Sequence, residues 1–180
     1  MGHSLVAREA LGAPGRSNKL GRPDPRDNRF VEEIAIRRVT KDTPDLMIPQ
    51  IQNADAWQML VDDDRAVLID VRTETEGRSI GVPDTGDTGR DARFVVWTDE
   101  HGQPNPRFVD QATDGLHPDT PILLLCRSGV RSNAAAELLT ASGYTNAMNV
   151  IAGFEGPVGA DGRHAGGWKD SLPHTTYRNG

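Results

Sequence analysis

Short runs of apolar residues alternate along this chain with segments in which apolar residues recur every three or four positions. The periodic segments predict helices over residues 53–60 and from about residue 132 to a stop at Gly143. The apolar runs are typical of strands buried on both faces of a sheet, and they lie at residues 67–71, 94–97, 122–125 and 146–150. Because strands and helices alternate, we expect a three-layer α/β sandwich, with a central, mainly parallel sheet flanked by helices.

Local signals refine this outline at three places. Asn53 stands where the first helix begins and is its expected N-cap. The pair Asn105-Pro106 predicts the start of a further short helix, because proline is favoured in a first helical turn. Residues 30–39 have a mixed pattern that fits either a short helix or an added strand.

Length and composition indicate one domain with flanking segments. The 180 residues are 36% hydrophobic, which suits one compact core. Residues 1–30 carry a net charge of +3 and many Gly and Pro residues, which predicts a disordered or expression-derived extension, with a mitochondrial-type transit peptide as the alternative. We expect residues 31–49 to be a linker or short added element, residues 50–174 to form the domain, and residues 175–180 to be a tail.

Charge and cysteine content exclude several classes of protein. The net charge of -6 argues against nucleic acid as the main partner. The sequence has no apolar run long enough to span a membrane and no apolar core of a secretory signal at its start, so no membrane partner is expected. A single cysteine cannot form an internal disulfide, which favours a reducing, cytoplasmic location.

That cysteine lies in a tight turn between an expected strand and an expected helix. The turn reads Cys126, Arg127, Ser128, Gly129, Val130, Arg131, Ser132. Its backbone N–H groups, the N-terminus of the helix and two arginines all favour negative charge, so the thiol should ionise more readily than that of a free cysteine. We therefore predict a nucleophilic cysteine; the alternative is a buried, inert one.

Two further polar residues stand at the C-terminal end of the strand at residues 67–71, where sites form in parallel sheets. Asp70 is expected to face the cysteine turn, either to hold Arg131 or the turn's N–H groups in place, which we favour, or to act as an acid or base. Arg72 is a candidate for substrate binding or support. No histidine has a partner at the spacing of a metal site, so neither a metal nor another cofactor is expected.

Four segments in order resemble the rhodanese family of sulfurtransferases. CRSGVRS (residues 126–132) resembles the active-site loop of that family, and VLIDVR (67–72) resembles its first central strand, with Glu76 where members often have a glutamate. NVIAGFEG (149–156) and GGWKDSLP (166–173) resemble its C-terminal segments. Where members often read Gly-His-Ile-Pro, this chain has Gly81-Val82-Pro83. The resemblance covers residues 50–173 and implies a rhodanese-like fold.

The resemblance also implies a chemistry, that of a thiosulfate sulfurtransferase. The Cys126 thiolate would attack the outer sulfur of an anionic donor such as thiosulfate and keep that sulfur as a persulfide. A thiol, cyanide or a sulfur-accepting protein would then take the sulfur. Arg127 is expected to point outward and bind the donor. Arg131 would either bind the donor too or fold under the turn toward Asp70 and shape it.

Two other functions compete with sulfur transfer. Cysteine phosphatases and arsenate reductases use related chemistry, but phosphatases have five residues between cysteine and arginine, whereas four separate Cys126 from Arg131. The shorter turn makes a smaller cradle that suits one sulfur better than a phosphate group. A non-catalytic sulfur-carrier or regulatory module is the other alternative, although such modules usually lack the cysteine.

Overall fold

The fold is that of a five-stranded parallel sheet with helices on both faces. The computed structural model describes residues 47–177; the predictions for residues 1–30 and for most of 31–49 lie outside this range. All pairings within the sheet are parallel, and the strand order is β1-β6-β5-β2-β4. In chain order the strands are β1 (Gln50–Ile51), β2 (Val67–Asp70), β4 (Arg93–Phe94), β5 (Ile122–Leu125) and β6 (Ala147–Val150).

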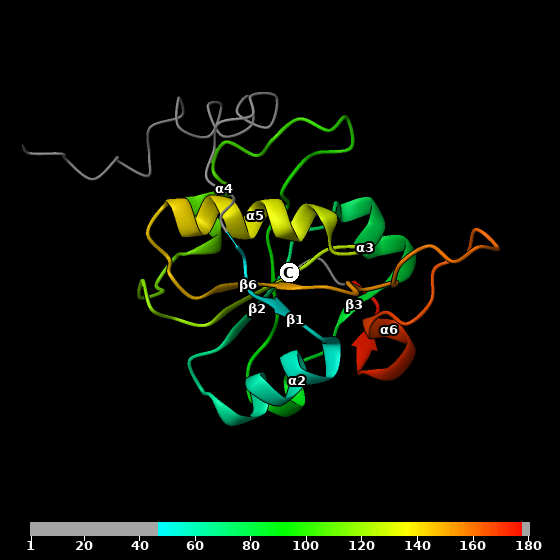
Figure 1. Ribbon diagram of the computed structural model, residues 1–180, viewed down its shortest axis with the longest axis horizontal. Coiled ribbons are helices and arrows are strands. Elements are labelled where there is room, and N and C mark those ends of the chain that lie inside the picture. Colours follow the sequence, from blue (N-terminus) through cyan, green and yellow to red (C-terminus); the bar gives the residue numbers. More distant parts are fainter. Residues whose placement is uncertain (1–46, 178–180) are drawn as a thin grey trace, which may run out of the picture.

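The helices form the two outer layers, as predicted from the alternating pattern (Figure 1). In Figure 1, α4 (Phe108–Ala112) and α5 (Val130–Ala141) lie above the sheet, and α2 (Asn53–Asp62) lies below it. Residues of β5 alternate between the layers: Ile122 and Leu124 pack in the core that includes α5, whereas Leu123 and Leu125 pack in the core that includes α2. Burial on both faces explains why this strand is apolar at every position.

The central strands and α5 lie close to their predicted positions, but other elements differ. The strand expected at residues 94–97 is shorter, although Val95 N–H still bonds to Asp70 O at 2.9 Å. Asn53 does not cap α2; its Nδ2 donates to Gly153 O at 3.1 Å instead, because the C-terminal segment passes beside this helix. Helix α3 (Glu74–Ile80) was not predicted, because its sequence ETEGRSI has almost no apolar stripe.

A small second sheet closes the C-terminal end of the domain. Strand β3 (Val82–Pro83) pairs antiparallel with β7 (His174–Thr175), and the short helix α6 (Trp168–Ser171) precedes β7. The Tyr177 ring packs on Phe94 with 4.9 Å between ring centroids, so the packed domain continues beyond the predicted boundary at residue 174. A short 3-10 turn, η1 (Gly86–Thr88), lies between β3 and β4. Over residues 47–177, no helix has the length and apolar character needed to cross a membrane.

Candidate active site

Cys126 directly follows β5 and is buried in the apolar core that includes α5, but its sulfur also contacts two polar groups. Only 1% of the residue is exposed. Its Sγ accepts a hydrogen bond from the Gly129 N–H at 3.2 Å and lies 3.2 Å from the Ser132 hydroxyl. An inert buried cysteine makes only apolar contacts, whereas this sulfur has two polar groups within hydrogen-bond distance. The geometry therefore supports the reactive alternative over the inert one.

The turn after Cys126 presents further backbone donors. Among the hydrogen bonds of residues 47–177, none is donated by the amide N–H of Ser128, Val130 or Arg131. These groups stand at the N-terminus of α5, which is twelve residues long and adds its dipole. These amide groups leave the turn with donors that an anion could accept.

Gly129 makes this turn fit against the segment that follows β6. Its φ of 89° lies in the left-handed region, and a Cβ there would stand 2.3 Å from the carbonyl oxygen of Ile151. No side chain fits at that distance. Gly129 is therefore required both by the conformation of the turn and by the close approach of the two chains.

Ser132 connects the sulfur to a chain of amide side chains. Its hydroxyl lies 2.7 Å from Asn149 Oδ1, and Asn149 Nδ2 donates to Gln50 Oε1 at 2.7 Å. Because a hydroxyl has one proton, Ser132 can donate to either the sulfur or Asn149 at one time. Asn149 was not predicted as a site residue; its occurrence in the segment NVIAGFEG was the only signal for it.

Arg131 is paired with Glu76, whereas Asp70, the partner favoured from the sequence, pairs with Arg72. The two terminal nitrogens of Arg131 lie 2.7 and 2.6 Å from the two oxygens of Glu76, a bidentate pair. Glu76 is placed by α3, where it forms a capping box with Thr73. Arg131 lies in the first turn of α5, so its pair with Glu76 joins the start of α5 to α3 beside the cysteine turn.

This pair makes stability depend on pH in a defined window. Burial alone would raise the pKa of Glu76, but hydrogen bonds from Arg131 and Thr73 outweigh it and lower that pKa from 4.5 to about 2. A lowered pKa stabilises the folded state above the unfolded value, and this contribution is lost as the pH falls from 4.5 toward 2. Because both side chains are partly exposed, water screens the pair and reduces its contribution to the unfolding free energy. We expect a contribution of about 2 kcal/mol at neutral pH.

We therefore expect the difference in unfolding free energy between the wild type and Glu76→Gln to be constant above pH 6. It should lose more than half of its size at pH 3. Urea denaturation of both proteins at pH 7 and pH 3 measures this difference. A difference that is the same at both pH values would contradict the assignment of Glu76 as the ionised partner of Arg131.

Asp70 and Arg72 form a separate, completely buried ion pair. Their closest atoms are 2.6 Å apart, and their side chains are 1% and 0% exposed. Burial, the largest influence, raises the pKa of Asp70, and the hydrogen bonds and charge of Arg72 oppose it. Arg72 also donates to Gly81 O at 2.7 Å, and its guanidinium lies 3.9 Å from the centre of the Phe154 ring. The guanidinium of Arg72 is thus occupied by Asp70, Gly81 O and the Phe154 ring, which favours a supporting role over donor binding.

Arg127 is exposed as predicted, but it is not free. Its side chain is 45% exposed, and its Nε lies 2.7 Å from Glu155 Oε1. Glu155 also pairs with Lys169 at 3.2 Å. Sequence reasoning missed both Glu155 and Lys169, because a charged residue in a Gly-rich segment usually indicates a solvated loop.

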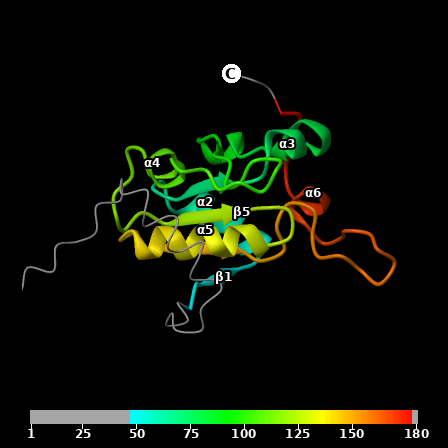
Figure 2. The ribbon, with the colours of Figure 1, turned by 90° about the horizontal axis from the view of Figure 1, so that it is seen from above.

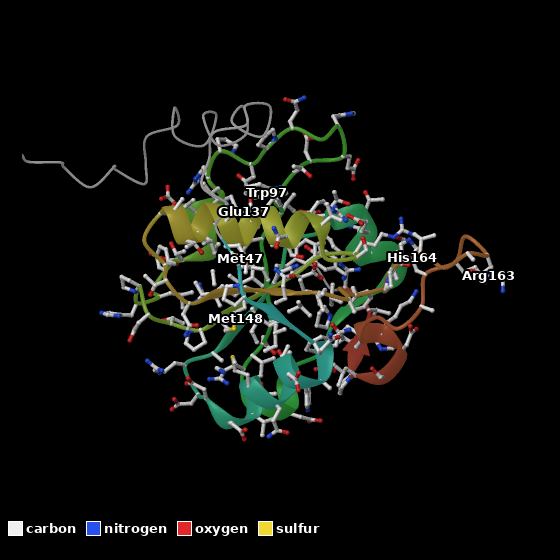
Figure 3. The ribbon with its side chains drawn as sticks, in the orientation of Figure 1. Met47, Trp97, Glu137, Met148, Arg163 and His164 are labelled. Carbon is white, nitrogen blue, oxygen red and sulfur yellow. The ribbon has the colours of Figure 1, made fainter. Side chains whose placement is uncertain are left out.

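Residues 153–156 brace the cysteine turn through the backbone. The N–H groups of Phe154 and Glu155 donate to the carbonyl oxygens of Cys126 and Arg127 at 2.7 and 3.0 Å. Phe154 and Trp168 are fully buried, as expected for the anchors of this segment. Beyond it, residues 157–165 form a loop that projects from the body of the domain (Figure 2), and Figure 3 places Arg163 at its outer end.

Two hollows of the described structure lie away from the cysteine turn. One of about 810 Å³ is lined by β4 and α4 residues such as Phe94 and Asp110, and one of about 510 Å³ is lined by residues that include Asp70 and Tyr177. Neither is lined by the cysteine turn. Within residues 47–177, no group of three or more His, Cys, Asp or Glu side chains has the arrangement of a metal site.

A cysteine at the end of a parallel strand, in a short turn that leads into a helix, is the arrangement that the sequence resemblance predicted. The sequence model of the rhodanese-like domain matches residues 52–158. The chain belongs to the rhodanese-like domain family. The parallel sheet with its flanking helices is the fold of this family, as predicted.

Similar proteins support this assignment. The rhodanese-like domain is 43% identical to the protein in the crystal structure of Rv0390 from M. tuberculosis, with a TM-score of 0.66; the match covers 72% of this chain and 98% of that one. It is 35% identical over 133 residues to the uncharacterized protein RC0915 of Rickettsia conorii, covering 71% of this chain and 98% of that protein. It also matches 26% of the Protein THYLAKOID RHODANESE-LIKE, chloroplastic, of Oryza sativa subsp. indica, at 31% identity.

Proposed function

We propose that this rhodanese-like domain is a sulfurtransferase that carries sulfur as a persulfide on Cys126. The strongest support is the surroundings of the Cys126 sulfur. It contacts the Gly129 N–H and the Ser132 hydroxyl, and the turn beside it has further backbone N–H groups without partners among the described residues. These groups match a sulfur anion in size and charge. A cysteine that must remain a reduced thiol between turnovers also suits a reducing compartment such as the cytoplasm.

The proposed reaction has two steps. The Cys126 thiolate attacks the outer sulfur of a donor such as thiosulfate; the S–S bond of the donor breaks, sulfite leaves, and a persulfide anion remains on Cys126. Cyanide, a small thiol or a sulfur-accepting protein then attacks the outer sulfur of the persulfide, and the Cys126 thiolate is restored. Each step exchanges one anion for another, so no general base is required.

The turn holds the negative charge during both steps. The backbone N–H groups are fixed by the start of α5 and by residues 153–156, so they need not reorganise when the persulfide forms. Arg127 contributes positive charge at the exposed side of the turn. Both terminal nitrogens of Arg131 bind Glu76. Arg131 therefore supports the conformation of the turn rather than binding the donor.

The same geometry disfavours phosphatase or arsenate reductase chemistry. In that chemistry an arginine of the turn must bind the equatorial oxygens of the transferred group. Arg131 is committed to Glu76 through both terminal nitrogens. A non-catalytic module does not require hydrogen-bond donors around a cysteine sulfur, so their presence favours catalysis.

Turnover with thiosulfate and cyanide tests this function. We expect steady formation of thiocyanate, measured colorimetrically, with double-displacement kinetics in which the two substrates give parallel double-reciprocal lines. The same preparation should release no inorganic phosphate from p-nitrophenyl phosphate or a phosphotyrosine peptide. Phosphate release without thiocyanate formation would contradict the proposal and favour the phosphatase alternative.

A further inference from the structure

Glu155 is tied to the cysteine turn by both its backbone and its carboxylate. Its N–H donates to Arg127 O at 3.0 Å, and its Oε1 lies 2.7 Å from Arg127 Nε. The Glu155 side chain is only 7% exposed, and Lys169 approaches its other oxygen at 3.2 Å. A carboxylate withdrawn from water acts on neighbouring charges with little screening. Glu155 must therefore reduce the positive potential at the exposed side of the turn.

The charged pairs around the turn nearly cancel. Glu76 binds Arg131, and Glu155 binds both Arg127 and Lys169. Three cations face two carboxylates, which leaves a net charge of one positive. Thiosulfate carries two negative charges, whereas a persulfide anion carries one. The Cys126 thiolate offsets that one charge, so each negative charge on an incoming donor meets no uncompensated cation, and the second charge of thiosulfate adds to the repulsion.

We propose that Glu155 is a specificity-determining residue that makes the donor site favour monoanionic persulfides over dianionic thiosulfate. This inference rests on the proposed sulfur transfer at Cys126. With a persulfide donor R–S–S⁻, the Cys126 thiolate attacks the outer sulfur, the donor S–S bond breaks, R–S⁻ leaves with the electron pair, and the persulfide forms on Cys126. The leaving thiolate takes a proton from water, and no oxidant or reductant is consumed.

The physics gives a quantitative signature. Electrostatic energy is proportional to the charge of the donor. Removing the charge of Glu155 should therefore help a dianion twice as much, on a logarithmic scale, as a monoanion. A change in the fold or in the reactivity of Cys126 would instead affect both donors by the same factor.

The experiment compares donors in the Glu155→Gln variant, which keeps an oxygen that can accept from Arg127. We expect kcat/KM to rise about tenfold for thiosulfate and about threefold for 2-hydroxyethyl persulfide, a monoanion, at low ionic strength. Both gains should shrink as salt is added. Glu155→Asp retains the charge and should keep the wild-type ratio of the two kcat/KM values, even if both values change with the shorter side chain.

Two further variants serve as controls. Glu74→Gln removes a carboxylate that is 55% exposed and pairs with Arg78 rather than with the turn, and it should change neither donor. Lys169→Gln removes a cation of the pair and should have the opposite effect to Glu155→Gln, with thiosulfate again affected more. This variant tests the same inference if Glu155→Gln does not fold.

The outcomes separate the inference from the proposed function. Equal changes for both donors, or no gain for thiosulfate in a folded Glu155→Gln protein, would overturn the role of Glu155 while leaving sulfur transfer intact. If the wild type takes sulfur from neither donor, the proposed function fails as well.

Discussion

Replacing Cys126 by serine is expected to abolish sulfur transfer without changing the fold. The substitution exchanges one sulfur atom for oxygen, which is a poor nucleophile at neutral pH because an alcohol hardly ionises. The hydrogen bonds donated by the Gly129 N–H and by the Ser132 hydroxyl can be accepted by a serine oxygen as well. Thiocyanate formation should fall to the uncatalysed background, while the melting temperature stays within a few degrees of the wild type.

Ser132→Ala is the matched control for this prediction, because it removes a donor next to the sulfur but keeps the nucleophile. That variant should retain measurable turnover at a reduced rate. Retained wild-type turnover in a folded Cys126→Ser protein would exclude Cys126 as the carrier of sulfur.

The largest loss of stability is expected from Arg72→Leu. This change leaves the Asp70 carboxylate, which is 1% exposed, without its cation, and also removes the hydrogen bond to Gly81 O and the contact with Phe154. Breaking one partner of a buried pair typically costs about 3–5 kcal/mol. Urea denaturation at pH 7 should show a lower midpoint with an unchanged slope.

Two comparisons identify the cause of that loss. The double variant Asp70→Leu/Arg72→Leu should recover part of the lost free energy, because no unpaired charge remains buried. Arg65→Leu, which breaks the pairs of a residue that is 57% exposed, should have little effect. If Arg72→Leu were no more destabilising than Arg65→Leu, the Asp70–Arg72 pair would not be the structural support that its burial indicates.

The fold was predictable where the sequence carries a strong pattern. The apolar run that forms β5 and the periodic residues of α5 define the strand, the turn and the helix that together place Cys126. Helix α3 has no such apolar pattern; the capping-box spacing of Thr73 and Glu76 was the signal for its start, and the support from Arg131 comes from a distant part of the chain.

The charged partners in the site could not be assigned from sequence. Asp70, Arg72 and Arg131 were all recognised as candidates, but which carboxylate binds which arginine depends on distances between strands and helices that no spacing encodes. Asp70 and Arg72 pair within one strand end, which left Glu76 to hold Arg131. Glu155 and Lys169 are fourteen residues apart and meet only because residues 157–165 form a loop between them.

The most direct test of the account is the intact mass of the wild-type protein after incubation with thiosulfate and removal of the excess. We expect a gain of one sulfur atom, located on the peptide that contains Cys126, which disappears when cyanide is added and thiocyanate is released. The Cys126→Ser protein should show no gain. A wild-type mass that does not change, or a gain that cyanide cannot remove, would contradict the persulfide on Cys126.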